Sequence, residues 1–149
     1  MSTAGTQLPE LTYESLTEGR RFSDTTMVVS ATMIRDYGRA VHNDALVSQA
    51  GALGGTPLCD PSLMILFGIA RRALRNDARL PPGGVLAAQD FEAERPLRAG
   101  ETVRTRPSVA AKYEKRGRRY VQLRCDLEDE AGAKIGRVDS YIIWAPGAR

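Results

Sequence analysis

The stretch Cys59-Asp-Pro-Ser-Leu-Met-Ile-Leu-Phe-Gly68 decides how this chain folds. Asp60 is a good helix N-cap because its carboxylate can accept hydrogen bonds from the free amides of a first turn. Pro61 costs no helical hydrogen bond at the first helical position. The apolar residues that follow surround much of the helix circumference, which is typical of a buried helix. The sequence therefore predicts a mostly buried helix from Pro61 to about Arg75.

The preceding residues predict shorter elements. The β-branched stretch Asp24–Val29 indicates a short strand. Ser30 is a suitable N-cap for a helix over residues 31–42, and a second, weaker helical segment covers residues 45–52. Residues 1–10 have the composition of a disordered lead-in, so we expect one domain over residues 11–149. One face of the helix over 31–42 carries Met33, Ile34, Tyr37 and Val41.

From Gly83 onward the apolar residues recur with a period of two, which is typical of strands with one face on a core. Turn residues at 116–118 and 130–133 separate these strands, so the second half predicts an antiparallel meander. Pro107 indicates a bulge or a sheet edge. The expected inward faces are Val103, Thr105, Pro107, Val109, Ala111 and Tyr113; Val121, Leu123, Cys125 and Leu127; and Val138, Ser140, Ile142 and Trp144.

Length and composition exclude several classes of protein. The chain has 149 residues, enough for one core, and its longest apolar run, residues 63–70, is far shorter than the roughly 20 residues of a membrane span. The N-terminus does not resemble a signal peptide, so we expect a cytoplasmic protein with reduced cysteines. A net charge of +3 with 6% aromatics disfavours nucleic acid as a partner. One histidine and two distant cysteines predict no metal site, and nothing indicates a cofactor.

Helices followed by long antiparallel strands form an α+β layout. The stretches Phe91–Val103, with Arg95-Pro-Leu-Arg-Ala-Gly100, Tyr113-Glu-Lys-Arg-Gly117 and Glu130-Ala-Gly132 resemble the second half of MaoC-like hot-dog domains. The stretches Tyr37–Val41 and Gly54–Leu63 are similar to the first half of that family, so the resemblance spans about residues 11–144.

The resemblance implies a hot-dog fold, a long antiparallel sheet wrapped around a central helix, which dimerises by sheet extension. It also implies an enzyme of the FAS1-like or R-specific enoyl hydratase-dehydratase type, acting on acyl chains carried by coenzyme A or an acyl carrier protein. The catalytic pattern GDxNPxH is altered here, since Asn43 stands in place of its Asp and Ser48 in place of its His. Cys59-Asp60-Pro61 replaces the usual AHG, as in subunits and half-domains that lack the catalytic pair and work beside a catalytic partner.

Hydration of an enoyl thioester needs a base, an acid and a donor for the thioester carbonyl. His42 and Asp44 are the candidate catalytic pair, provided that an irregular turn brings both to one pocket. A helix C-cap is the alternative role of His42. Backbone amides at the start of the helix that follows Asp60 are the candidate donors.

The candidate substrate-binding residues flank these positions, and each has an ordinary structural alternative. Asp60 fits an N-cap, Cys59 fits core packing better than a nucleophile, and Asn43 fits a turn. Tyr37 and Phe67 fit a core as well as a tunnel wall. The full candidate set is Tyr37, Asn43, Cys59, Asp60, Ser62, Leu63 and Phe67.

Together these features predict a hydro-lyase acting on an acyl or polyketide-like thioester, as a homodimer or paired with a homologous hot-dog subunit. The alternatives are a non-catalytic acyl-binding subunit of a dehydratase, a biosynthetic cyclase or isomerase, and a thioesterase. We expect neither nucleic acid nor a membrane as a partner. The basic hairpin over residues 112–119 is either a solvated tip or a dock for the acidic carrier of the substrate.

Overall fold

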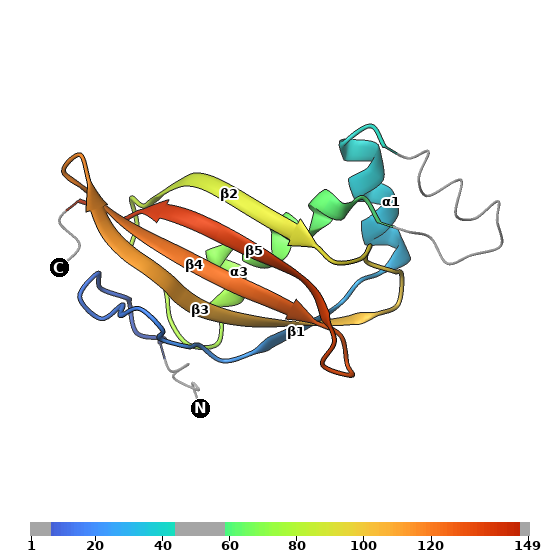
Figure 1. Ribbon diagram of the computed structural model, residues 1–149, viewed down its shortest axis with the longest axis horizontal. Coiled ribbons are helices and arrows are strands. Elements are labelled where there is room, and N and C mark those ends of the chain that lie inside the picture. The colour runs from blue at the N-terminus through green and yellow to red at the C-terminus, as the bar shows by residue number, and fades with distance from the viewer. Residues whose placement is uncertain (1–6, 44–58, 147–149) are drawn as a thin grey trace, which may run out of the picture.

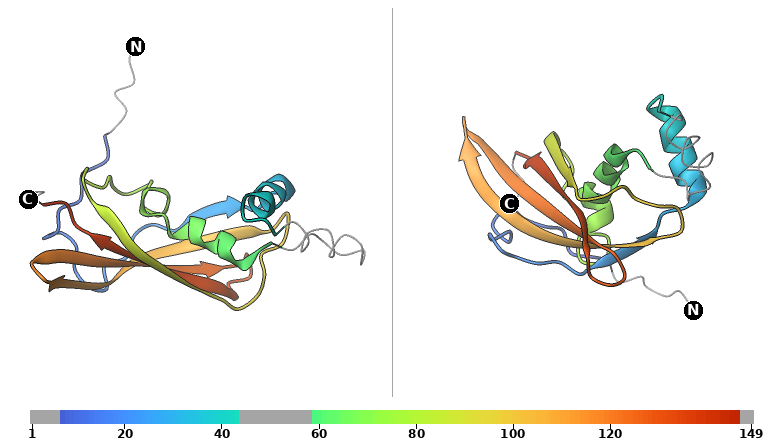
Figure 2. Two further views of the ribbon diagram at one scale, coloured as in Figure 1. Left: turned by 90° about the horizontal axis from the view of Figure 1, so that it is seen from above. Right: turned by 45° about the vertical axis from the view of Figure 1, so that its right-hand side comes forward.

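Five antiparallel strands form a single sheet in the order β1-β3-β4-β5-β2, in a computed structural model that describes residues 7–43 and 59–146 (Figure 1). The helices lie on one face of this sheet (Figure 2). This is the expected α+β hot-dog arrangement. The strands are β1 (Thr25–Val28), β2 (Val85–Ala93), β3 (Thr102–Lys115), β4 (Arg118–Glu128) and β5 (Lys134–Ile143), and the helices are α1 (Ala31–Ala40), η1 (Pro61–Gly68) and α3 (Ala70–Ala73).

The central helix is shorter than predicted and differs in type. The prediction of one helix from Pro61 to about Arg75 is wrong, because η1 is a 3₁₀ helix and the extended residue Ile69 separates it from α3. Side chains of the sheet donate hydrogen bonds to backbone carbonyls that, in a continuous α-helix, would accept from amides four residues further on. Gln89 donates to the carbonyl of Ile65 at 3.2 Å, and Ser140 donates to the carbonyl of Gly68 at 2.8 Å. The predicted burial holds for the inner side of η1, while Ile69 is exposed.

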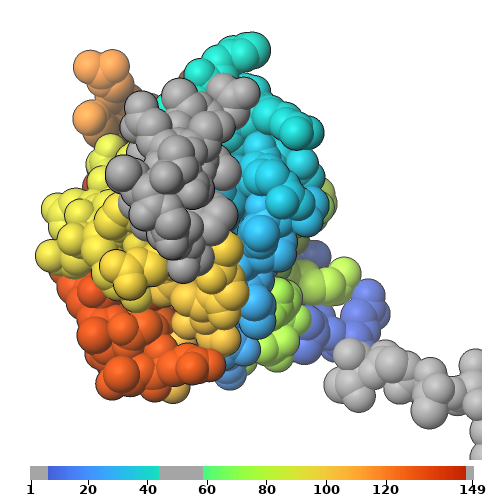
Figure 3. Space-filling model, turned by 90° about the vertical axis from the view of Figure 1, so that its right-hand side faces the viewer, coloured from blue at the N-terminus to red at the C-terminus, as the bar shows by residue number. Residues whose placement is uncertain are grey.

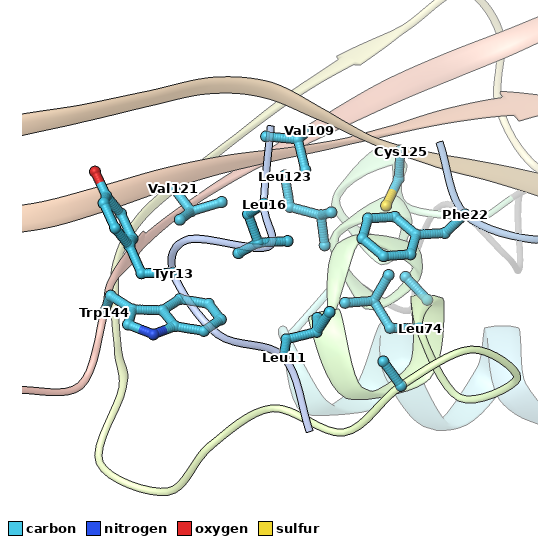
Figure 4. Packing of buried hydrophobic residues seen from close by; sticks show 12 residues of the cluster. Leu11, Tyr13, Leu16, Phe22, Leu74, Val109, Val121, Leu123, Cys125 and Trp144 are labelled. Atoms are coloured by element: carbon cyan, nitrogen blue, oxygen red, sulfur yellow. The ribbon is translucent and has the colours of Figure 1, made fainter. Parts of the chain in front are cut away.

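Two apolar clusters hold the helices on the sheet. One surrounds η1 and includes Leu63, Met64 and Phe67, packed against β3, β4 and β5. The other lies at the far end of the sheet, where the segment before β1 and α3 pack over the strands (Figure 4). Each cluster contains residues from both halves of the chain, so sheet and helices form one packed unit. The second cluster includes Leu11, Tyr13, Leu16, Phe22, Leu74, Val109, Val121, Leu123, Cys125 and Trp144.

A bulge in β3 corrects part of the predicted strand face. The register against β4 shifts between Val109 and Ala111, so Lys112 rather than Ala111 lies opposite the buried Val121. Because a one-residue shift reverses the alternation of side chains, Ala111 and Tyr113 do not share the inward face of Val109, as was predicted. Tyr113 is exposed and stacks on Tyr120 of β4, with ring centroids 5.1 Å apart.

Pro107 lies two residues before the bulge, beside a part of β3 that β1 does not reach. There the N-terminal segment runs along the strand, and the amide of Phe22 donates to the carbonyl of Pro107 at 3.0 Å. The missing N–H of Pro107 therefore faces this segment and interrupts no bond to β4. The predicted edge holds only in that β1 does not reach Pro107, because β3 is an inner strand and the N-terminal segment, bridged at Arg21 and Ser108, covers this side.

The helix predicted over residues 31–42 is confirmed as α1, with Ser30 capping the amide of Met33 at 3.0 Å. The segment predicted as a helix over residues 45–52 lies outside the described residues. Strand β2 forms one edge of the sheet and is exposed along almost its whole length, including Val85, Leu86 and Phe91. Within the described ranges, the helices are too short or too polar for any of them to span a membrane.

Candidate functional site

The start of η1 is anchored by the loop between β2 and β3. Leu97 is fully buried, and its carbonyl accepts a hydrogen bond from the amide of Cys59 at 3.1 Å. Arg95 and Glu101 clamp this loop through paired hydrogen bonds of 3.1 and 2.8 Å. Gly100 has a positive φ of 85°, which favours glycine, and its amide bonds to Val29 after β1. The loop therefore fixes the position of the residues that follow Cys59.

A polar network joins the start of η1 to α1. Asp60 accepts hydrogen bonds from the amide of Ser62 at 2.9 Å, from its hydroxyl at 2.6 Å and from the side-chain amide of Asn43 at 2.7 Å. The hydroxyl oxygens of Tyr37 and Ser62 lie 2.8 Å apart. Four of the predicted substrate-binding residues thus form one connected group. We call this group the Asp60 network.

The protons of the Asp60 network have a definite direction. A carboxylate only accepts, so the single hydroxyl proton of Ser62 goes to Asp60, and Tyr37 must donate to Ser62. Asn43 donates through Nδ2. Lone pairs of the Tyr37 hydroxyl and of the Asn43 amide oxygen therefore remain for a further donor. A water molecule or a substrate hydroxyl has a proton suited to a hydrogen bond with these lone pairs.

The same bonds determine the protonation of Asp60. Hydrogen bonds from Asn43 and Ser62 hold the pKa of the Asp60 carboxyl below its usual value, since they outweigh the opposing effect of burial. Asp60 is therefore a stable carboxylate and a weak base. Its side chain also occupies the amide of Ser62, and its carbonyl occupies that of Leu63 at 3.0 Å. The sequence predicted these amides as donors to a thioester carbonyl. That prediction is wrong for the amides of Ser62 and Leu63, because both are already hydrogen-bonded to Asp60.

Of the predicted catalytic pair, the structure describes only His42, which lies at the end of α1. His42 is exposed and has a positive φ of 55°. Its amide bonds to the carbonyl of Arg39 at 3.1 Å, and the amide of Asn43 bonds to that of Gly38 at 2.7 Å. This is a Schellman cap, the structural alternative for His42, and it turns Asn43 back toward Asp60. Asp44 lies outside the described residues, and so does Ser48.

The remaining predicted residues lie in the core. Leu63, Phe67 and Cys59 are 0%, 5% and 1% exposed and belong to the apolar cluster around η1. Burial raises the pKa of the Cys59 thiol to about 12, so it carries almost no thiolate at neutral pH. Figure 3 looks onto the end of the molecule that carries the Asp60 network, with α1 in blue to cyan and the end of β2 in yellow. No group of three metal-ligating side chains occurs within the described residues.

A second feature lies at the other end of η1, where a recess of about 250 Å³ opens beside α3. We call it the apolar recess, because its walls are mostly apolar. Sequence reasoning placed Trp144 and Ile142 on an inward strand face but missed the loop over residues 80–84, whose Pro-Pro-Gly-Gly run marked only a turn. The walls include Gly68, Ile69, Leu80, Pro81, Pro82, Leu86, Ile142 and Trp144.

The basic hairpin lies at the end of the sheet opposite α1 (Figure 1). Arg116 and Gly117 form its turn with positive φ values of 52° and 74°. Arg119 pairs with Glu14 at 3.2 Å, and Lys112 lies over the ring of Tyr13 at 4.1 Å. Part of the basic cluster therefore stabilises the N-terminal segment. The hairpin also lies at the opposite end of the sheet from the Asp60 network, which argues against a role in docking the carrier of a substrate bound at that network.

Comparison with known proteins identifies the family. The family described as FAS1-like, dehydratase domain region matches residues 17–137, and the chain belongs to it. The MaoC-like hot-dog class expected from the motifs is thereby confirmed. Comparison with curated proteins gives no match.

Solved structures of this class share the fold at low sequence identity. The unliganded R-hydratase PhaJ1 from Pseudomonas aeruginosa is 18% identical, with 94% of this chain and 89% of that chain covered and a TM-score of 0.69. A MaoC-like dehydratase from Rhodospirillum rubrum is 18% identical, with 91% and 98% covered and a TM-score of 0.70. The HadBC (3R-hydroxyacyl-ACP dehydratase) complex from Mycobacterium tuberculosis is 19% identical, with 85% and 96% covered and a TM-score of 0.69.

Proposed function

We propose that this protein catalyses the hydration or dehydration of an acyl thioester carried by coenzyme A or an acyl carrier protein. The observation that carries the proposal is the placement of the Asp60 network and the apolar recess at opposite ends of η1. Eight residues of 3₁₀ helix span about 16 Å, a length suited to an acyl chain laid along the helix. The membership in a dehydratase family supports the same reaction.

The Asp60 network supplies orientation in this reaction. The lone pairs of Tyr37 and Asn43 accept hydrogen bonds from the attacking water or, in dehydration, from the departing hydroxyl, and so orient it. Asp60 polarises both groups through the bonds described above. As the only histidine of the chain, His42 remains the proposed base, with Asp44 as its partner.

A conjugated enoyl thioester such as crotonyl-CoA tests the proposal, because hydration removes its ultraviolet absorbance. The purified protein should consume this absorbance, and Tyr37→Phe should lower kcat about 10- to 100-fold by misplacing the water. Tyr113→Phe, at the far end of the sheet, is the matched control and should leave kcat unchanged. No turnover with enoyl thioesters of any chain length would overturn the proposal for the chain alone.

A second candidate is an acyl-binding subunit whose partner supplies the acid and base. Two observations favour it. The carboxylate of Asp60 is a weak base that occupies the amides at the start of η1, and β2 offers an exposed edge for pairing with a homologous subunit. The similar HadBC structure is itself a complex. Activity that appears only when a homologous hot-dog subunit is added would establish this role.

A further inference from the structure

A second recess adjoins the apolar recess and has the opposite chemistry. It measures about 400 Å³, and three arginines, Arg71, Arg75 and Arg79, line its walls. We call it the basic recess. The two recesses share Arg71, Leu80 and Pro82, so an apolar space and a cationic space meet along one wall.

The positive charge of the basic recess is not neutralised within the described residues. The ion pairs there involve none of its three arginines. Arg79 donates to the carbonyl of Leu8, another wall residue, at 3.0 Å, which orients its guanidinium at the recess without cancelling its charge. Arg75 donates to the carbonyl of Thr26 in β1 at 3.2 Å, so its guanidinium points away from the recess. Glu10 is the single carboxylate in the walls of this recess. The recess therefore has a net charge suited to an anion.

Trp144, one of the residues that line the apolar recess, carries a buried donor without a partner among the described residues. Trp144 is 4% exposed, and its indole N–H is buried with no acceptor among the described residues. In Figure 4 the indole nitrogen lies on the side of the ring away from Val121. Buried donors without partners are rare in native proteins.

We propose that the two recesses form one site for an amphipathic anion, an aliphatic chain that ends in a carboxylate or phosphate group. The chain lies in the apolar recess, where it leaves water, and the anionic group is bound by the forked donors of Arg71 and Arg79. Binding of such a molecule is a property of the folded protein and is tested without turnover. Only its consequence for the reaction rests on the proposed function: the preferred acyl chain carries an anionic group at its far end.

Calorimetric titration below micellar concentrations tests this site. Decanoate and decyl phosphate should each bind at least about tenfold more tightly than decanol, which lacks the charge, and the tighter of the two identifies the preferred anion. Acetate and inorganic phosphate, which lack the chain, should bind weakly. Arg71→Gln should weaken binding of the preferred amphiphile about tenfold, while Arg118→Gln on the basic hairpin, the matched control, should not.

A second variant tests the apolar part without disturbing the core. Ile69 is 37% exposed at the rim of the apolar recess, so Ile69→Trp should fill that recess and weaken decanoate and decanol alike. Equal affinity for decanol and both anions, or unchanged binding by Arg71→Gln, would overturn the inference. Binding without turnover would defeat only the proposed function, whereas turnover without amphiphile binding would defeat only this inference.

Discussion

Asn43 donates a 2.7 Å hydrogen bond to Asp60, 17 residues further along the chain, and so ties the end of α1 to the start of η1. The bond depends on two caps. The Schellman cap of α1 directs Asn43, and the N-cap of η1 holds Asp60. Two ordinary helix ends thereby produce the polar end of the candidate site.

The Asp60 network should give a pH-dependent stability. The folded pKa of Asp60 lies below its ordinary value, so its ionised form stabilises the fold fully above about pH 4, and this contribution is lost as the pH falls through the folded pKa. Urea unfolding should show wild type more stable than Asp60→Asn at pH 7, with a smaller difference at pH 3. Asp36→Asn, at an exposed position of α1, is the control and should show no such trend. An equal difference at both pH values would contradict the assignment.

Removing the whole carboxyl group of Asp60, the N-cap of η1, should lower the free energy of unfolding more than Asp60→Asn does. Asp60→Ala should cost about 1 kcal/mol at pH 7, within the range of about 0.5–2 kcal/mol for lost N-caps. Asn43→Ala should cost less, because Asp60 keeps both bonds from Ser62. Denaturant unfolding of the two single variants and the double variant gives the coupling between them. Strict additivity would show that the Asn43–Asp60 bond contributes nothing to stability.

The cap at His42 is made by the backbone, so the imidazole itself should contribute little to stability. Its left-handed backbone favours glycine, so His42→Gly should raise the free energy of unfolding by about 1 kcal/mol. His42→Ala should leave stability nearly unchanged, since alanine and histidine are both strained there. If His42 is the base, both variants lose turnover although one is more stable than wild type. A melting temperature that falls in His42→Gly would show that the imidazole itself supports the fold.

Gly68 should tolerate no side chain. A Cβ there would collide with the side chain of Val138, so Gly68→Ala should destabilise the protein by about 1–3 kcal/mol. The matched control is Gly84→Ala, whose Cβ would lie 3.4 Å from its nearest neighbour, the carbonyl oxygen of Ile143. Adding Val138→Ala should recover part of the loss in Gly68→Ala. Absence of any recovery in this double-mutant cycle would place the strain elsewhere.

Both cysteines should be unreactive in the native protein. Burial raises the pKa of Cys59 and of Cys125 to about 12, which leaves about one thiol in 10,000 ionised at pH 8. Ellman's reagent should therefore react with neither until denaturant is added, and with both afterwards. Fast reaction of one thiol in the native state would reopen the nucleophile hypothesis for Cys59.

Local patterns in the sequence determined much of this protein. The caps at Ser30 and Asp60, the strand alternation from Gly83 onward and the turn at Arg116-Gly117 depend on neighbours a few residues away, so they could be read directly. The motif around Arg95–Gly100 carried the resemblance to the family that the comparison then showed, and the Arg95–Glu101 clamp at this motif is built within one loop.

Only the tertiary structure decided the rest. The end of η1 at Gly68 depends on carbonyls taken by Gln89 and Ser140, and the outward turn of Tyr113 depends on a bulge against β4. The Asp60 network and the two adjoining recesses likewise join residues far apart in the chain. Such contacts are set by strand register and packing over long separations, which a local period does not encode.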